Sequence, residues 1–103
     1  MLNQNFIKNA IIKITDNEYV NVFVTEVNSV EELTSYKQEF IQLNTRKAWC
    51  IIANTHVSKN DNILVTEYYD HDDLFDGHQI CIYHLVDATD KEIVDLCQQS
   101  LEI

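Results

Sequence analysis

Residues 63–86, ILVTEYYDHDDLFDGHQICIYHLV, hold two runs of alternating side chains on either side of an acidic loop. The runs at 63–69 and 79–86 have the period of two that is typical of strands. Asp76-Gly77, between them, is a strong turn dipeptide. The stretch therefore predicts two strands joined by a loop at 70–77, which sets the core of the fold.

Two further strands are expected upstream of this pair. Residues 47–57 alternate in the same way and are followed by a polar connection of hairpin length at 58–62. The three strands then form a meander. Residues 19–27 carry apolar side chains on both faces. This pattern predicts a central strand that is covered, at least in part, on both sides.

Capping signals predict two helices. Ser29 and Glu32 have the spacing of a capping box, and Thr89 and Glu92 repeat it near the end of the chain. The helix at 29–44 carries an apolar stripe made of Val30, Leu33, Tyr36, Phe40 and Leu43. The closing helix carries an inward face made of Ile93, Leu96, Cys97, Ser100 and Leu101. We interpret both stripes as core faces.

The N-terminal segment is ambiguous. Apolar residues in 2–14 repeat every four positions, as on one face of a helix, whereas 10–14 fits a strand equally well. We expect a helix that continues into an extended segment. The fold class is then α+β, with a mainly antiparallel, four- to five-stranded sheet packed against two or three helices in the order (α)-β-α-β-β-β-α.

Length and charge limit the possible functions. The 103 residues fit one acidic domain, 1–103, with a net charge of −10. Such a charge argues against direct binding to nucleic acid, which needs Lys and Arg, and against docking on anionic membranes. The sequence shows neither a signal peptide nor a membrane span, so we expect a cytoplasmic protein.

The negative charge is concentrated in the second half of the chain. Residues 1–58 hold 5 basic and 6 acidic residues, a net charge of −1, whereas residues 59–103 hold 2 and 11, a net charge of −9. Like charges that crowd together favour a basic partner more than they favour the fold. We therefore predict a partner-binding face formed by Glu67, Tyr68, Tyr69, Asp70, Asp72, Asp73 and Asp76, in which the tyrosines act as anchors.

Metal binding is a weaker interpretation of the same loop. Read as an EF-hand from Asp72, the loop has Leu74 and Tyr83 where ligands are required, so it fails as a calcium site. His71 and His78 flank the aspartates, and imidazole with carboxylate suits zinc or manganese. Their spacing matches no specific metal motif, so we predict no cofactor and keep these histidines as weak metal candidates only.

Nucleophilic catalysis finds little support in the pattern. Cys81 and His84 are three residues apart in a strand and so face opposite ways. Cys50 and His56 share a face but lie about 20 Å apart along an extended strand. The three cysteines, Cys50, Cys81 and Cys97, are expected to be free thiols in a reducing cytosol. A single glycine excludes phosphate-binding and nucleophile-elbow motifs, so we predict no enzyme.

The sequence therefore favours a non-enzymatic protein that blocks a basic surface of a partner protein, most simply the nucleic-acid-binding surface of an enzyme. Inhibitors of nucleases or defence systems, such as phage anti-restriction and anti-CRISPR proteins, have these properties, as do toxin immunity proteins. Two alternatives remain open. One is a homodimeric scaffold or regulatory subunit, and the other is a small metal-dependent enzyme that uses the His71–His78 loop.

Overall fold

A four-stranded sheet forms the centre of the molecule. The structure, a computed structural model, describes residues 2–45, 50–70 and 77–101. The strands are β1 (Asn21–Glu26), β2 (Cys50–Val57), β3 (Ile63–Asp70) and β4 (Gln79–His84). Their order across the sheet is β1-β4-β3-β2, so β3 and β4 are central, and these are the two strands in the stretch that decided the fold class.

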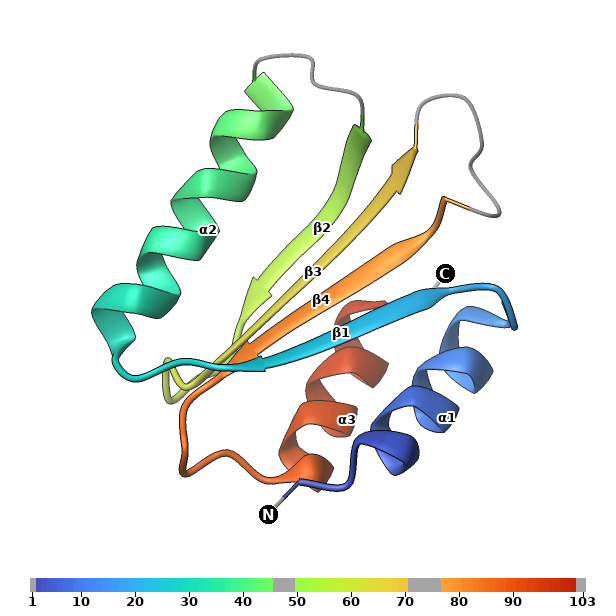
Figure 1. The fold of residues 1–103 in the computed structure, drawn as a ribbon, viewed down its shortest axis with the longest axis horizontal. Coiled ribbons are helices and arrows are strands. Elements are labelled where there is room, and N and C mark those ends of the chain that lie inside the picture. Colours follow the sequence, from blue (N-terminus) through green and yellow to red (C-terminus); the bar gives the residue numbers. More distant parts are fainter. Residues whose placement is uncertain (1, 46–49, 71–76, 102–103) are drawn as a thin grey trace.

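Helices lie on both faces of the sheet, as Figure 1 shows. They are α1 (Gln4–Thr15), α2 (Val30–Thr45) and α3 (Asp90–Ser100). α1 and α3 lie side by side on one face, while α2 lies alone on the other, over β2 and β3. The α+β class and the order of elements along the chain therefore agree with the prediction, with three helices and four strands in the described residues.

The sheet is mixed, and the prediction of a mainly antiparallel sheet is wrong in this respect. β3 pairs antiparallel with both β2 and β4, but β1 pairs parallel with β4. The cause is the connection through α2, which returns the chain to the end of the sheet where β1 began. β1 and β2 therefore run in the same direction, and so does β4 after two reversals.

β1 is an edge strand, which corrects the prediction of a central one. Val22 and Val24 pack against the core under α1 and α3. The opposite face of β1 is open at Phe23, because α2 packs mainly on β2 and β3. Phe23 on that face is 51% exposed, and Tyr19, just before the strand, is 58% exposed.

α1 settles the ambiguity of the N-terminal segment in favour of a helix. The helix is continuous from Gln4 to Thr15, so the expected extended segment at 10–14 is absent. Ile7 and Ile11 are fully buried, four residues apart on its inner face. The helix ends at Asp16, which has a left-handed conformation with φ of 50° and begins the turn to β1.

The two capping predictions have different outcomes. At α3 the Thr89 hydroxyl accepts from the Glu92 amide, and the Glu92 carboxylate accepts from the Thr89 amide, which confirms the capping box. At α2 the Ser29 hydroxyl accepts from the Glu32 amide as expected. The Glu32 carboxylate, however, accepts from the amide of Asn28 rather than from that of Ser29.

Thr89→Ala should therefore lower the free energy of unfolding by about 1 kcal/mol, because the first turn of α3 loses a hydroxyl acceptor for its amides. Urea denaturation measures the change. Thr89→Ser keeps the hydroxyl and should stay within a few tenths of a kcal/mol of the wild type. Equal losses in both variants would show that the cap does not stabilise this helix.

The core has two parts, one on each face of the sheet. The larger part lies under α1 and α3 and consists of Ile7, Ile11, Ile63, Val65, Ile80, Ile82, Ala88, Ile93, Cys97 and Leu101. The smaller part lies under α2, where Leu33 contacts Leu64 and Val27. Tyr36 of α2 stacks on Tyr83 of β4 with 4.2 Å between ring centroids. Val30, predicted to be in the stripe of α2, is instead 41% exposed.

Candidate functional site

A buried carboxylate–imidazole pair lies where β3 and β4 meet the acidic loop. Glu67 of β3 and His78, just before β4, lie with Oε2 and Nε2 2.8 Å apart, and each side chain is only 3% exposed. Glu67 points to the α1/α3 face because it alternates in phase with the buried Ile63 and Val65. A charged group can remain at this depth only with hydrogen-bond partners.

Asn17 determines which nitrogen of His78 carries the proton. The amide oxygen of Asn17 accepts from the Tyr19 backbone N–H at 2.9 Å, so its amide nitrogen faces His78 Nδ1, 3.2 Å away. An amide NH2 only donates, and Nδ1 is therefore the acceptor. The proton lies on Nε2 and is donated to Glu67. The pair is thus a neutral imidazole and a carboxylate, with both imidazole nitrogens engaged.

Tyr69 completes the cluster. Its ring stacks on His78 with 4.4 Å between centroids, and its hydroxyl donates to Glu67 Oε2 at 3.3 Å. Burial first, and then the negative charge of Glu67, raises the pKa of the Tyr69 phenol above its ordinary value of 10.0. The phenol therefore stays a neutral donor. We call Asn17, Glu67, Tyr69 and His78 the buried cluster.

The buried cluster holds three separate segments together. Asn17 belongs to the turn between α1 and β1, Glu67 and Tyr69 to the end of β3, and His78 to the start of β4. A backbone hydrogen bond of 2.9 Å from Asn21 to the His78 carbonyl strengthens the same junction. The polar groups of the cluster hydrogen-bond to one another. The arrangement therefore positions the surrounding segments, and none of its groups is left as a free base.

The predicted partner-binding residues divide into three groups. Glu67 is in the buried cluster, and Tyr68 is 9% exposed on the other face, where its hydroxyl donates to Gln79 at 2.8 Å. Tyr69 is half-buried, and Asp70 ends β3. Asp72, Asp73, Asp76 and the weak metal candidate His71 lie outside the described residues. Glu67 and Tyr68 are thus buried and make contacts within this chain. That the aspartates bind a partner stays a prediction.

The structure adds a second acidic segment to this end of the sheet. The contact between Asn17 and His78 places the exposed Asp16 and Glu18 beside the base of the loop that follows Asp70. Neither carboxylate lies within 4.0 Å of a Lys or Arg nitrogen in the described part of the chain. They line a hollow of about 370 Å³ together with Ile12, Asn17 and the exposed Tyr19.

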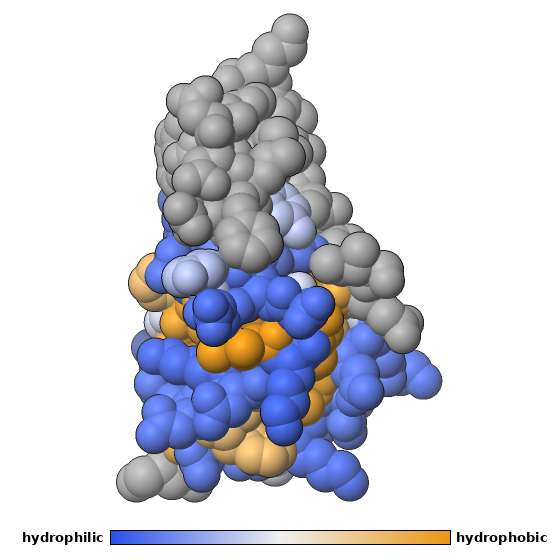
Figure 2. Space-filling view, turned by 90° about the vertical axis from the view of Figure 1, so that its right-hand side faces the viewer, coloured by the Kyte–Doolittle hydropathy of each residue, from blue (hydrophilic) through white to orange (hydrophobic). Residues whose placement is uncertain are grey.

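We call Asp16, Glu18 and Tyr19 the acidic end. Seen from the side of α1 and the turn that follows it, the surface is mainly hydrophilic (Figure 2). Asp16, Glu18 and Tyr19 could not be grouped with the acidic loop from the sequence, because they are some fifty positions away from it. Exposed carboxylates beside an exposed aromatic ring suit a lysine or arginine side chain from another molecule.

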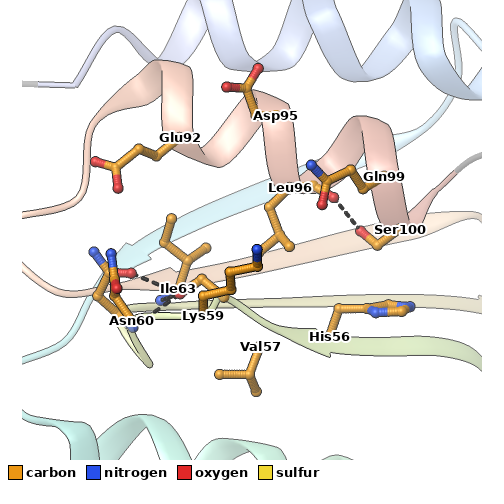
Figure 3. Close-up of a pocket in the computed structure, with 12 residues that line it drawn as sticks. His56, Val57, Lys59, Asn60, Ile63, Glu92, Asp95, Leu96, Gln99 and Ser100 are labelled. Atoms are coloured by element: carbon orange, nitrogen blue, oxygen red, sulfur yellow. Dashed lines mark hydrogen bonds between the residues drawn. The ribbon is translucent and has the colours of Figure 1, made fainter.

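A larger groove lies between α3 and the connection from β2 to β3. It measures about 560 Å³ and has Ile63 and Leu96 in its lining. Figure 3 shows Lys59 reaching from the connection toward α3, which carries Glu92 and Asp95. Because its lining mixes both signs of charge, this groove lacks the uniform potential that would select a basic partner.

Among the other candidate nucleophiles and bases, Cys81 and His84 are buried, whereas His56 of β2 is exposed. Burial raises the pKa of the Cys81 thiol above its ordinary value of 9.0, and the side chain is 6% exposed. His84 Nδ1 lies 2.9 Å from the Leu85 carbonyl, to which it can donate. Within residues 2–45, 50–70 and 77–101, no three His, Cys, Asp or Glu side chains are grouped so as to hold a metal ion.

No family model, curated protein or solved structure matches this chain. The geometry therefore carries the functional argument by itself. Among the described helices, none has the length and apolar character needed to cross a membrane.

Proposed function

We propose that this chain is a non-enzymatic binding protein that occupies a basic surface of a partner protein through its acidic end. One observation carries the proposal. The hydrogen bond from Asn17 to His78 brings the exposed carboxylates of Asp16 and Glu18 to the end of the sheet where β3 ends and β4 begins, although these segments are far apart in sequence. Because the aspartates at 70–76 connect these two strand ends in the sequence, we expect their charge to add to that of Asp16 and Glu18.

The partner's chemistry follows from the charge. The net charge of −10 raises the local concentration of cationic surfaces and speeds their encounter, and clustered carboxylates select a complementary patch. Surfaces that bind nucleic acid carry such patches. Tyr19, more than half exposed, supplies an aromatic face for a cation or an apolar stem. A protein that blocks a nuclease or another nucleic-acid-binding enzyme fits these features, as anti-restriction, anti-CRISPR and toxin immunity proteins do.

The chain offers a matched pair of variants for testing this proposal. Asp16 and Asp61 are both exposed aspartates with positive φ, at 50° and 55°, and Asn tolerates that conformation. Asp16→Asn with Glu18→Gln removes two charges from the acidic end. Asp61→Asn with Glu31→Gln removes two exposed charges elsewhere. Both double variants change the net charge equally.

The partner is first recovered from a lysate of the native host on immobilised protein at low and at high salt. With the recovered partner, the Asp16/Glu18 variant should associate roughly tenfold more slowly than the wild type, and the Asp61/Glu31 variant should change little. The wild-type association rate should fall steeply as salt rises. Recovery of no basic partner would overturn the proposal, as would equal effects of the two variants.

A further inference from the structure

The outer edge of β1 has hydrogen-bonding groups without a neighbouring strand. The amides of Asn21 and Val27 donate to the carbonyls of His78 and His84, so the odd-numbered residues of β1 direct their backbone groups toward β4. Successive residues of a strand alternate in this direction. The N–H and C=O groups of Val22 and Val24 therefore point outward, where no described strand pairs with them.

This edge lacks the devices that usually keep an edge strand from pairing. β1, NVFVTE, contains neither lysine nor proline, and its single charge is Glu26 at the end. Phe23 is exposed on the open face. A hollow of about 300 Å³ runs along the strand, lined by Lys8, Ile12, Val20, Asn21, Val22 and Phe23.

The distribution of charge indicates what covers the edge. Residues 1–26, which form α1 and β1, hold two lysines and three acids, a net charge of −1, so the other 77 residues hold −9. Asp16 and Glu18 of this segment lie before the strand, and β1 itself carries one charged residue, Glu26, so the strand edge has no cluster of carboxylates that would select a basic partner. It suits a second copy of the same chain, because such a pairing brings together two strands that each carry one charged residue, Glu26.

We infer that two copies pair antiparallel through their β1 edges about a twofold axis at Phe23. In this register Val22 lies opposite Val24 of the second copy, and the two such pairs exchange four backbone hydrogen bonds. The Phe23 rings face each other on the open side. Glu26 lies opposite Val20 of the second copy, in the hollow lined by Lys8, so no like charges are directly opposed. The result is a continuous eight-stranded sheet.

The oligomeric state of the full chain tests the inference, measured by sedimentation equilibrium over a range of concentrations. Phe23→Lys places two lysines directly opposite each other and removes an aromatic pair, so it should weaken the dimer at least about tenfold. The matched control is Ile41→Lys, which changes an apolar residue of similar exposure, 48%, on α2 and should leave the dimer unchanged. Circular dichroism confirms that both variants fold.

Cross-linking tests the register. Phe23→Cys should form a covalent dimer on mild oxidation, because residues paired at the axis are close enough for a disulfide. Thr25→Cys should not, since it lies opposite Asn21 of the second copy. A wild-type chain that is monomeric at every concentration overturns the inference, as does a dimer that Phe23→Lys leaves intact or equal cross-linking of the two cysteine variants.

Salt separates this inference from the proposed function. Two copies with a net charge of −10 each repel one another at long range, so added salt should strengthen the dimer or leave it unchanged. Binding of a basic partner through the acidic end should weaken instead. If the chain dimerises but no basic partner is recovered, only the proposed function is contradicted. If the chain is monomeric and binds a basic partner, only the inference of the dimer is contradicted.

Discussion

Glu67→Ala is expected to lower the free energy of unfolding by about 3 kcal/mol. The substitution leaves the Nε2–H of His78 buried without an acceptor and removes the acceptor of the Tyr69 hydroxyl. A buried polar group left without its partner typically costs about 1 to 3 kcal/mol, and because the substitution removes an ionised acceptor shared by two donors, we take the upper end of that range. Urea denaturation followed by circular dichroism measures the change.

Two further variants identify the cause of the loss. Glu67→Gln keeps a carbonyl oxygen that can accept from Nε2, so it should cost less than half as much as Glu67→Ala. Glu67→Leu combined with His78→Leu removes both members of the pair and fills their space, and should be more stable than Glu67→Ala by about 1 kcal/mol or more. If Glu67→Gln and Glu67→Ala were equally destabilising, the hydrogen bond to His78 would not be the source of stability.

Alternation and capping signals were sufficient to predict most of the elements. The strands at 63–70 and 79–84 and the capped helix beginning at Asp90 follow directly from local pattern, because burial on a strand and capping of a helix depend on near neighbours. The position of β1 could not be predicted in this way. Its two apolar faces suggested a central strand, but the coverage of a face depends on where α2 lies, which is a tertiary property.

The parallel pairing of β1 could nevertheless have been predicted from the order of the elements along the chain. A strand followed by one helix and a three-stranded meander runs in the same direction as the first and last strands of that meander. These are the only strands with a free edge, so β1 had to pair parallel with β2 or with β4. The antiparallel character of the meander does not extend to β1, because the chain runs the length of the sheet once more through α2 before β2 begins.

The candidate site was predictable only in part. Glu67 alternates in phase with Ile63 and Val65, so its inward orientation could have been inferred, but counting charge along consecutive residues concealed it. The contact between Asn17 and His78 joins residues 61 positions apart, and no local pattern signals it. Only the structure therefore shows that Asp16 and Glu18 lie at this end of the sheet.

Alkaline pH should destabilise the fold through Cys97, which is fully buried beneath α3. Burial raises the pKa of its thiol from 9.0 to about 12. Between these values the unfolded chain loses the proton and the folded chain keeps it. The folded state therefore binds more protons, and its stability falls as pH rises. Between about pH 8 and about pH 10.5 we expect a loss of about 2 kcal/mol from this one group.

The test compares urea denaturation of the wild type and of Cys97→Ala at both pH values. The variant loses packing contacts and should be less stable at about pH 8, but its stability should fall about 2 kcal/mol less on going to about pH 10.5. Part of the slope should persist, because burial also raises the pKa of Tyr83 to about 12. Equal slopes for the two proteins would mean that the thiol ionises in the folded state as readily as in the unfolded chain, and that α3 opens to solvent before the sheet unfolds.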